Sequence, residues 1–194
     1  MGYTVYGSQT SPFVRRIRLL LGNTPYEFKE INPYEGQDAI DLNKINPINK
    51  IPVFTDGDLT IWDSRQIFNY LNGIHRFQNM DWNDENQLTA IDEMMSAGIA
   101  LMQMKRSGIN IEENYMFISR QRDRVQSILD YLKPFMTGEG LTEWNFQVMA
   151  IYSYIDWDNF RSISKLDQNP VCQDFLKAHK DRPVVFKTQI PRIS

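Results

Sequence analysis

The chain has 194 residues, of which 42% are hydrophobic and 23% are charged, and its net charge at pH 7 is −3. This length allows one large domain or two small ones with a packed core. The charge balance argues against a nucleic-acid-binding surface, and no apolar stretch reaches the roughly 18 residues of a membrane span. One cysteine and two well-separated histidines exclude a disulfide framework and argue against a zinc site. We therefore expect a cytoplasmic protein with no signal peptide, metal or membrane segment.

Strand and helix patterns alternate over the first part of the chain. Strands are predicted at residues 4–6, 26–31, 53–54 and 59–62, and helices at 12–21, 38–43 and 64–71. The first helix has a good N-cap in Ser11 and a proline, Pro12, at its first position. Its apolar stripe leaves three arginines on what we interpret as a solvated face: Arg15, Arg16 and Arg18. The predicted order is β-α-β-α-β-β-α.

All strong patterns in the second part of the chain are helical. The polar stretch 73–83 is interpreted as a linker, so the predicted domains are 1–76 and 84–194. Apolar residues recur at helical spacing within 88–102, 125–132 and 146–157, and a last helix is predicted at 170–180, with Pro183 just beyond it. Pro134 and the glycines that follow it are predicted to end the second of these helices. The predicted fold class is therefore an α/β domain followed by an all-α domain.

Three short motifs occur in an order and spacing that resemble the glutathione transferase family. Residues 11–16, Ser-Pro-Phe-Val-Arg-Arg, resemble the S-P-[FY]-x-R-[RK] opening of many bacterial members. Residues 46–53, Asn-Pro-Ile-Asn-Lys-Ile-Pro-Val, resemble the segment N-P-x-x-K-[IV]-P-V. Asp63 and Ser64 resemble the acidic-Ser pair of the glutathione site. The resemblance covers nearly the whole chain.

Two further segments refine this resemblance. Residues 142–145 lie where the family usually carries a capping box that ends in Asp, and here that position is Asn145. Residues 120–123 and 159–161 are similar to a bacterial subgroup of cytosolic type, the YibF-like proteins.

The resemblance implies an N-terminal thioredoxin-like domain that binds glutathione and a C-terminal helical bundle domain. It implies glutathione as a co-substrate, no metal, and a cis peptide bond before Pro52. In the family, the positions of Asp63 and Ser64 hold the γ-glutamyl end, and the backbone of Ile51 docks the cysteinyl part. The full set of expected glutathione-binding residues is Phe13, Lys50, Ile51, Pro52, Asp63 and Ser64, with Ser11 as the catalytic residue.

The chemistry of these residues leaves alternatives open. A glutathione thiol becomes reactive as a thiolate, which a hydroxyl donor and a helix N-terminus both favour. Ser11 offers both, but it could also serve only as a helix cap, and Thr10 or a backbone N–H could donate to the sulfur instead. Asp63 and Ser64 could likewise be a helix cap without a ligand. Lys50 could meet the glycyl carboxylate or simply be solvated.

The second part of the chain gives weaker indications. Four methionines gather on its first helix, and they fit either a bundle core or an apolar pocket and dimer interface: Met94, Met95, Met102 and Met104. We expect a homodimer across this helix. Tyr115, Trp157 and Phe160 are candidate pocket residues, and Cys172 is expected to be a buried or incidental thiol.

Two functions from different classes remain. One is a detoxification enzyme that conjugates the glutathione thiolate to small apolar electrophiles. The other is a non-catalytic binding or regulatory protein with the same fold, because a fold alone does not fix a function. A maleylacetoacetate isomerase is a third option, although that group begins with Ser-Ser where this chain has Ser11-Pro12. Nothing in the sequence identifies the electrophile.

Overall fold

The computed structural model describes residues 2–191 and divides into two compact units. One unit contains residues 2–79 together with residues 182–191, and the other runs from Met80 to Asp181. Residues 182–191 therefore group with the first unit, whereas the sequence analysis placed them in the predicted helical domain, 84–194.

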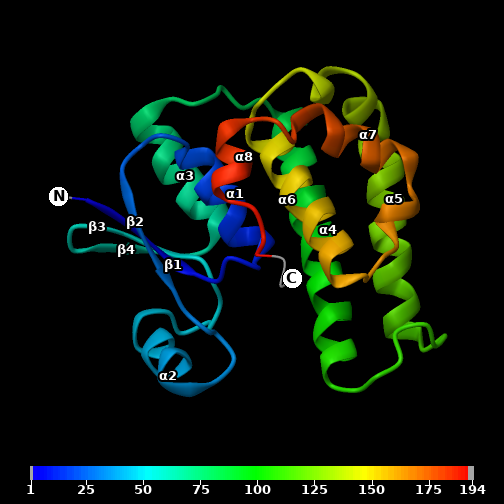
Figure 1. Cartoon of the computed structure of the whole chain (residues 1–194), viewed down its shortest axis with the longest axis horizontal. Coiled ribbons are helices and arrows are strands. Elements are labelled where there is room, and N and C mark those ends of the chain that lie inside the picture. Colours follow the sequence, from blue (N-terminus) through cyan, green and yellow to red (C-terminus); the bar gives the residue numbers. More distant parts are fainter. Residues whose placement is uncertain (1, 192–194) are drawn as a thin grey trace. The chain divides into compact units, whose positions relative to one another are not determined.

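The first unit is built on a four-stranded sheet (Figure 1). Its strands lie in the order β2-β1-β3-β4, with β1 parallel to β2 and antiparallel to β3, and with β3 antiparallel to β4. Their bounds are Tyr3–Gly7 for β1, Tyr26–Glu30 for β2, Val53–Asp56 for β3 and Leu59–Ile61 for β4. The two edge strands are half exposed, whereas Val5, Val53 and Phe54 of the central strands are fully buried.

Four helices complete this unit. They are α1 (Pro12–Leu21), α2 (Gly36–Ile45), α3 (Ser64–His75) and the short α8 (Pro183–Lys187). Helices α1 and α3 pack against each other and bury Val14, Ile17 and Ile67 completely. The element order β-α-β-α-β-β-α is thus the predicted thioredoxin-like order, and it is confirmed.

The second unit consists of helices. They are α4 (Trp82–Arg106), α5 (Met116–Thr137), α6 (Phe146–Arg161) and α7 (Pro170–His179), with the 3₁₀ turns η1 (Glu139–Leu141) and η2 (Leu166–Gln168). Helix α4 packs on α5 and α6, and α7 packs on α5 and α6 (Figure 1). Although α4 and α5 are long, no described helix carries an apolar stretch that could cross a membrane.

Several predicted helix boundaries were wrong. Helix α5 continues through Pro134 to Thr137, although a proline inside a helix loses a backbone hydrogen bond and its ring crowds the preceding turn. The packing of Leu132 and Met136, each 1% exposed, on either side of Pro134 offsets this cost. Helix α3 extends to His75, and Pro183 opens α8. Asn145 does not end a capping box: it is itself the N-cap of α6 and accepts the Val148 N–H at 3.0 Å.

The methionines of α4 belong to the interior of a single chain. Met94 and Met95 are 0% exposed and Met102 is 5% exposed, while Met104 is half buried. They fill the apolar interior, as flexible thioether side chains often do. The prediction that this stripe faces a partner subunit is therefore wrong.

Candidate functional site

The loop from Ser8 to Ser11 leads from β1 into α1. It forms a turn in which the Ser11 N–H donates to the Ser8 carbonyl at 3.0 Å, and the hydroxyls of Ser8 and Thr10 lie 3.2 Å apart. Ser11 is the N-cap of α1, as predicted, and its Oγ accepts the Val14 N–H at 3.3 Å. A serine hydroxyl has two acceptor lone pairs and one hydrogen. Capping therefore leaves the Ser11 hydrogen available to a ligand, and the two interpretations of Ser11 are compatible.

Glu30, at the end of β2, holds this loop from the side. Both of its carboxylate oxygens accept the Gln9 N–H, at 3.0 and 3.1 Å. The parallel ladder continues past the strands, because the Ile31 N–H donates to the Gly7 carbonyl at 3.0 Å. Sequence reasoning missed Glu30, since a glutamate at the end of an exposed strand carries no local signal of this contact.

The Ile51–Pro52 segment lies beside the same loop. The register of β1 with β3 pairs Tyr6 with Val53, so the residues that follow β1 meet the residues that precede β3. The Ile51–Pro52 peptide bond is cis, as the resemblance implied, with Pro52 buried and Ile51 half buried. Lys50 is exposed.

Asn46 shapes the approach to this segment. Its side chain is fully buried, donates from Nδ2 to the Lys50 carbonyl at 2.7 Å and accepts the Ile48 N–H at 3.1 Å. The Asn-Pro pair in the sequence is a turn signal that could have indicated this role.

Asp63 and Ser64 lie at the start of α3. Asp63 is the exposed N-cap and accepts the Arg65 N–H at 2.7 Å through Oδ1. Its second oxygen has no hydrogen-bond partner within residues 2–191. Ser64, the first helical residue, is 1% exposed, so its side chain is directed into the unit.

The arginines of α1 are buried, and the prediction of a solvated face was wrong. Arg15, Arg16 and Arg18 are 1%, 0% and 9% exposed. Arg16 donates to the Ser64 hydroxyl from Nη2 at 2.6 Å and from Nε at 3.2 Å, and its guanidinium lies 5.0 Å from the centre of the Phe13 ring.

Arg18 shows why the hydropathy pattern was misleading. Its guanidinium lies 4.1 Å from the centre of the Phe28 ring, and its Nε donates to the Tyr26 hydroxyl at 3.3 Å. Long arginine stems pack like apolar side chains while the planar head finds ring and hydrogen-bond partners. A helix can therefore be buried on its polar side when such partners are supplied by strands distant in the sequence.

Together these contacts bring the three predicted segments to one end of the sheet. The β1–β3 register joins the Ser8–Ser11 loop to Ile51–Pro52, and the Arg16–Ser64 bonds join the first turns of α1 to the start of α3. Two helix N-termini and a buried guanidinium all favour an anion, and a half-exposed serine hydroxyl lies in the same region. The arrangement suits an anionic ligand that carries an ionisable nucleophile.

The candidate residues of the second unit do not form such a site. Trp157 is 1% exposed and stacks on Tyr154 with ring centres 5.7 Å apart, so it is a core residue, while Tyr115 is 66% exposed. Cys172 is buried, as predicted, and burial raises the pKa of its thiol to about 12. A buried thiol with a raised pKa is typical of a structural cysteine. A cavity of about 410 Å³ lies next to it and contains none of the predicted glutathione-site residues.

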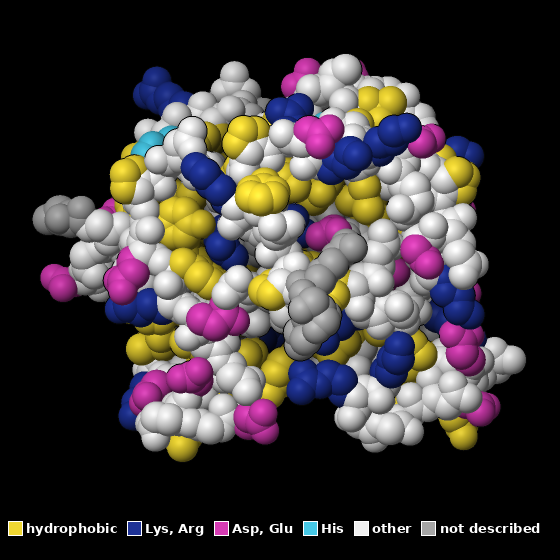
Figure 2. All heavy atoms as spheres, viewed as in Figure 1, with side chains coloured by type: hydrophobic (Ala, Val, Ile, Leu, Met, Phe, Trp, Pro, Cys, Tyr) yellow, Lys and Arg dark blue, Asp and Glu magenta, His cyan; other side chains and the backbone are white. Residues whose placement is uncertain are grey.

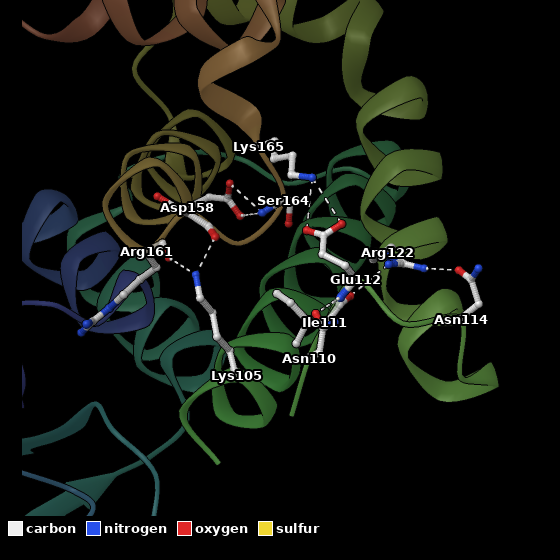
Figure 3. A network of polar contacts seen from close by, with 11 residues as sticks. Lys105, Asn110, Ile111, Glu112, Asn114, Arg122, Asp158, Arg161, Ser164 and Lys165 are labelled. Atoms are coloured by element: carbon white, nitrogen blue, oxygen red, sulfur yellow. Dashed lines mark hydrogen bonds and ion pairs between the residues drawn. The ribbon is translucent and has the colours of Figure 1, made fainter. Parts of the chain in front are cut away.

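A buried carboxylate, Asp158, organises the loop after α6 (Figure 3). It is 0% exposed and accepts the Ser164 N–H at 3.0 and 3.2 Å and the Leu166 N–H at 3.3 Å. Burial raises its pKa to about 6, although the hydrogen bonds from Ser164 and Leu166 act in the opposite direction. These bonds fix a loop, so we assign Asp158 a structural role.

Charges of both signs are mixed on one face of the protein. On the face drawn in Figure 2, Lys and Arg side chains are interspersed with Asp and Glu side chains. Within residues 2–191, no cluster of three or more His, Cys, Asp or Glu side chains is arranged to hold a metal ion.

Known proteins resemble this chain in sequence. Residues 1–73 match the family model of the glutathione S-transferase N-terminal domain. The GST-like protein YibF of Escherichia coli K12 is 27% identical over 171 residues, which cover 81% of this chain and 83% of YibF. Glutathione S-transferase F7 of Arabidopsis thaliana is 31% identical over 116 residues, 58% of this chain and 50% of that protein.

Solved structures resemble the fold over its full length. A glutathione transferase family member from Pseudomonas fluorescens Pf-5, solved with bound glutathione, has a TM-score of 0.80 at 21% identity and covers 98% of this chain and 100% of that one. A glutathione S-transferase from Methylobacterium radiotolerans, in complex with glutathione sulfonate, has a TM-score of 0.81 at 15% identity, with 100% and 97% covered. At these identities the likeness establishes the fold.

Proposed function

Because this chain belongs to the glutathione S-transferase family, we propose that it is a glutathione transferase that conjugates the glutathione thiolate to small apolar electrophiles. The observation that carries the proposal is the meeting of Ser11, the cis Ile51–Pro52 segment and the start of α3 at one end of the sheet. Ser11 supplies a hydroxyl donor for a thiol, the Ile51–Pro52 segment an extended backbone for a peptide, and the start of α3 a binding site for a carboxylate. Glutathione, an anionic peptide with a thiol, matches all three.

In this proposal, the peptide lies along the edge formed by these segments. The free carboxylate oxygen of Asp63 pairs with the γ-glutamyl ammonium, and the start of α3 with Ser64 receives the adjacent carboxylate. The backbone of Ile51 docks the cysteinyl residue in the manner of an added strand. Lys50, which is exposed, reaches the glycyl carboxylate, and the half-buried Phe13 ring forms an apolar wall.

The proposed chemistry is the activation of a thiol. The hydroxyl hydrogen of Ser11 donates to the sulfur, so the bound thiol loses its proton to solvent at a lower pH than a free thiol, whose pKa is about 8.5. The thiolate then attacks the electrophilic carbon and forms a carbon–sulfur bond. The leaving group departs with its electron pair, or an added carbanion takes a proton from water.

The test combines calorimetry with a thiolate absorbance titration and a turnover screen with aryl halides, enals and peroxides. Ser11→Ala should lower turnover by roughly ten- to a thousandfold, the range for one preorganised donor, with a much smaller change in glutathione affinity. The pKa of bound glutathione should rise in the same variant. Ser11→Gly is the matched control for capping, because glycine also lacks the hydroxyl but costs a helix only a few tenths of a kcal/mol at the N-cap.

Each outcome identifies a different mechanism. Equal turnover and thiol pKa in Ser11→Gly and the parent would reduce Ser11 to a helix cap. A loss confined to Thr10→Val would move the donor to Thr10, whose hydroxyl pairs with that of Ser8. Glutathione binding without turnover of any electrophile would favour a binding protein over an enzyme. No glutathione binding would refute the proposal.

We further propose that the chain forms a homodimer in the cytoplasm. Twofold pairing is the commonest form of oligomer, and the buried methionines of α4 are not needed for it. Large apolar side chains remain for an interface: Tyr131 is 50% exposed, and Met116 and Phe117 on the same helix are 75% and 54% exposed. A sedimentation mass of one chain at micromolar concentration would reject this pairing.

A further inference from the structure

The contact between Arg16 and Ser64 links two elements that lie 48 residues apart. Two nitrogens of one guanidinium, Nη2 and Nε, donate to the same hydroxyl oxygen at 2.6 and 3.2 Å. Both side chains are buried, with Arg16 0% and Ser64 1% exposed. The Phe13 ring, 5.0 Å from the guanidinium carbon, packs near the same head group. The hydroxyl of Ser64 is therefore held by a buried cation.

This geometry decides which hydrogen bond Ser64 can still make. A serine hydroxyl offers two lone pairs and one hydrogen, and the two N–H groups of Arg16 occupy its acceptor side. The positive charge also turns the hydroxyl hydrogen away from Arg16. Within residues 2–191, Arg16 is the only hydrogen-bond partner of the Ser64 hydroxyl, so this hydrogen has no acceptor in the described chain. A buried donor without an acceptor is costly, and a bound ligand would remove that cost.

We propose that Arg16 is a positioning residue that makes Ser64 a dedicated donor and thereby selects ligands with a carboxylate at the γ-glutamyl end. The inference rests on the proposed function, because it assumes that glutathione binds at the start of α3. Arg16 acts through Ser64: it aims the hydroxyl hydrogen and places a positive charge behind it. A carboxylate accepts a bond from such a donor more strongly than a neutral group does. The planar fork of arginine can place two N–H groups on one oxygen, which an ammonium cannot reproduce.

The alternative is that the Arg16–Ser64 contact only stabilises the packing of α1 against α3. The ratio of the affinities for two peptides, one with and one without the carboxylate, distinguishes this structural role from the proposed one. The probes are glutathione and γ-aminobutyryl-cysteinylglycine, the same peptide without the α-carboxylate of its γ-glutamyl residue. The parent should bind glutathione roughly 10- to 100-fold more tightly than this analogue, the range for a charge-assisted hydrogen bond. In Arg16→Met the ratio should fall to within a few fold, while the affinity for the analogue stays nearly the same. If the contact were only structural, Arg16→Met would weaken the binding of both peptides by the same factor and leave their ratio unchanged.

Three further variants complete the design. Arg18→Met removes another buried guanidinium of α1, one that contacts Phe28 and Tyr26, and it should keep the parent's ratio. Ser64→Ala should abolish the ratio, and adding Arg16→Met to it should cause no further loss. If Arg16→Met does not fold, Arg16→Lys replaces it as the test variant. The affinity ratio in Arg16→Lys should be at least about fivefold smaller than in the parent, because a lysine ammonium lacks the planar pair of N–H groups that holds the Ser64 oxygen.

The results distinguish this inference from the proposed function. A parent that binds neither peptide refutes both. A parent that binds glutathione tightly and keeps its ratio in Arg16→Met, or in Arg16→Lys where that variant decides, overturns the role of Arg16 alone. An unchanged ratio in Ser64→Ala also overturns it, because Arg16 would then have no hydroxyl through which to act.

Discussion

Replacing Asp158 tests how much a buried carboxylate contributes to the second unit. Its two oxygens accept the Ser164 N–H at 3.0 and 3.2 Å (Figure 3). One of them also accepts the Leu166 N–H at 3.3 Å, and the side chain is 0% exposed. In Asp158→Ala both N–H groups lose their acceptor, and Leu166 is itself buried. At about 1–3 kcal/mol for the buried Leu166 N–H, and less for the N–H of the half-buried Ser164, the expected loss of unfolding free energy is about 2–4 kcal/mol.

Asp158→Asn is the matched variant, because it keeps one acceptor oxygen and removes the charge. Burial raises the pKa of Asp158 from 3.8 to about 6, a shift of about two units. The folded protein thus holds this proton more tightly than the unfolded chain does. The carboxyl stabilises the fold most below about pH 4, and this contribution is lost as the pH rises through 6. At about 1.4 kcal/mol per unit, and because the unfolded carboxyl is already partly ionised at pH 4, the parent should lose about 2 kcal/mol relative to Asp158→Asn between pH 4 and pH 7.

Chemical denaturation of the three proteins at several pH values measures both effects. Asp158→Ala should be the least stable at every pH, and the difference between the parent and Asp158→Asn should shrink or reverse with rising pH. Two results would refute the reasoning. One is an equal loss of unfolding free energy in Asp158→Ala and Asp158→Asn. The other is a stability advantage of the parent over Asp158→Asn that stays constant or grows between pH 4 and pH 7.

Two other substitutions test the packing and capping of the helices. A Cβ on Gly98 would lie 2.5 Å from the hydroxyl oxygen of Tyr154 and 2.7 Å from its ring, so Gly98→Ala should lower the free energy of unfolding by about 1–3 kcal/mol. Gly73→Ala is the control, since nothing lies near its added Cβ and alanine should stabilise α3 by up to about 1 kcal/mol; similar thermal shifts in both variants would contradict the predicted clash. Asn145→Ala should cost about 0.5–2 kcal/mol because the Val148 N–H loses its cap, whereas Asn145→Asp should cost much less, and denaturant curves that coincide for the two would exclude capping.

The sequence by itself determined the features whose cause is local. Ser11 and Pro12 start a helix because a side-chain oxygen can accept a free N–H and a proline has no N–H to lose, and the structure has this cap. Asp63 caps α3 for the same reason. The order of strands and helices in the first unit also followed from short-range periodicity. The likeness to glutathione transferases came instead from the three short motifs at residues 11–16, 46–53 and 63–64.

Only the tertiary structure decided which side chains are buried and which pairs meet. Periodicity identifies the apolar face of α1, but it cannot show that Phe28 and Ser64 supply partners on the polar face, so Arg16 and Arg18 were assigned to solvent. The burial of Asp158 was equally invisible, because it depends on N–H groups that become available only when the chain turns back after α6. Hydrophobic pattern is a property of neighbours along the chain, whereas the burial of a polar group requires a partner brought to it by the fold.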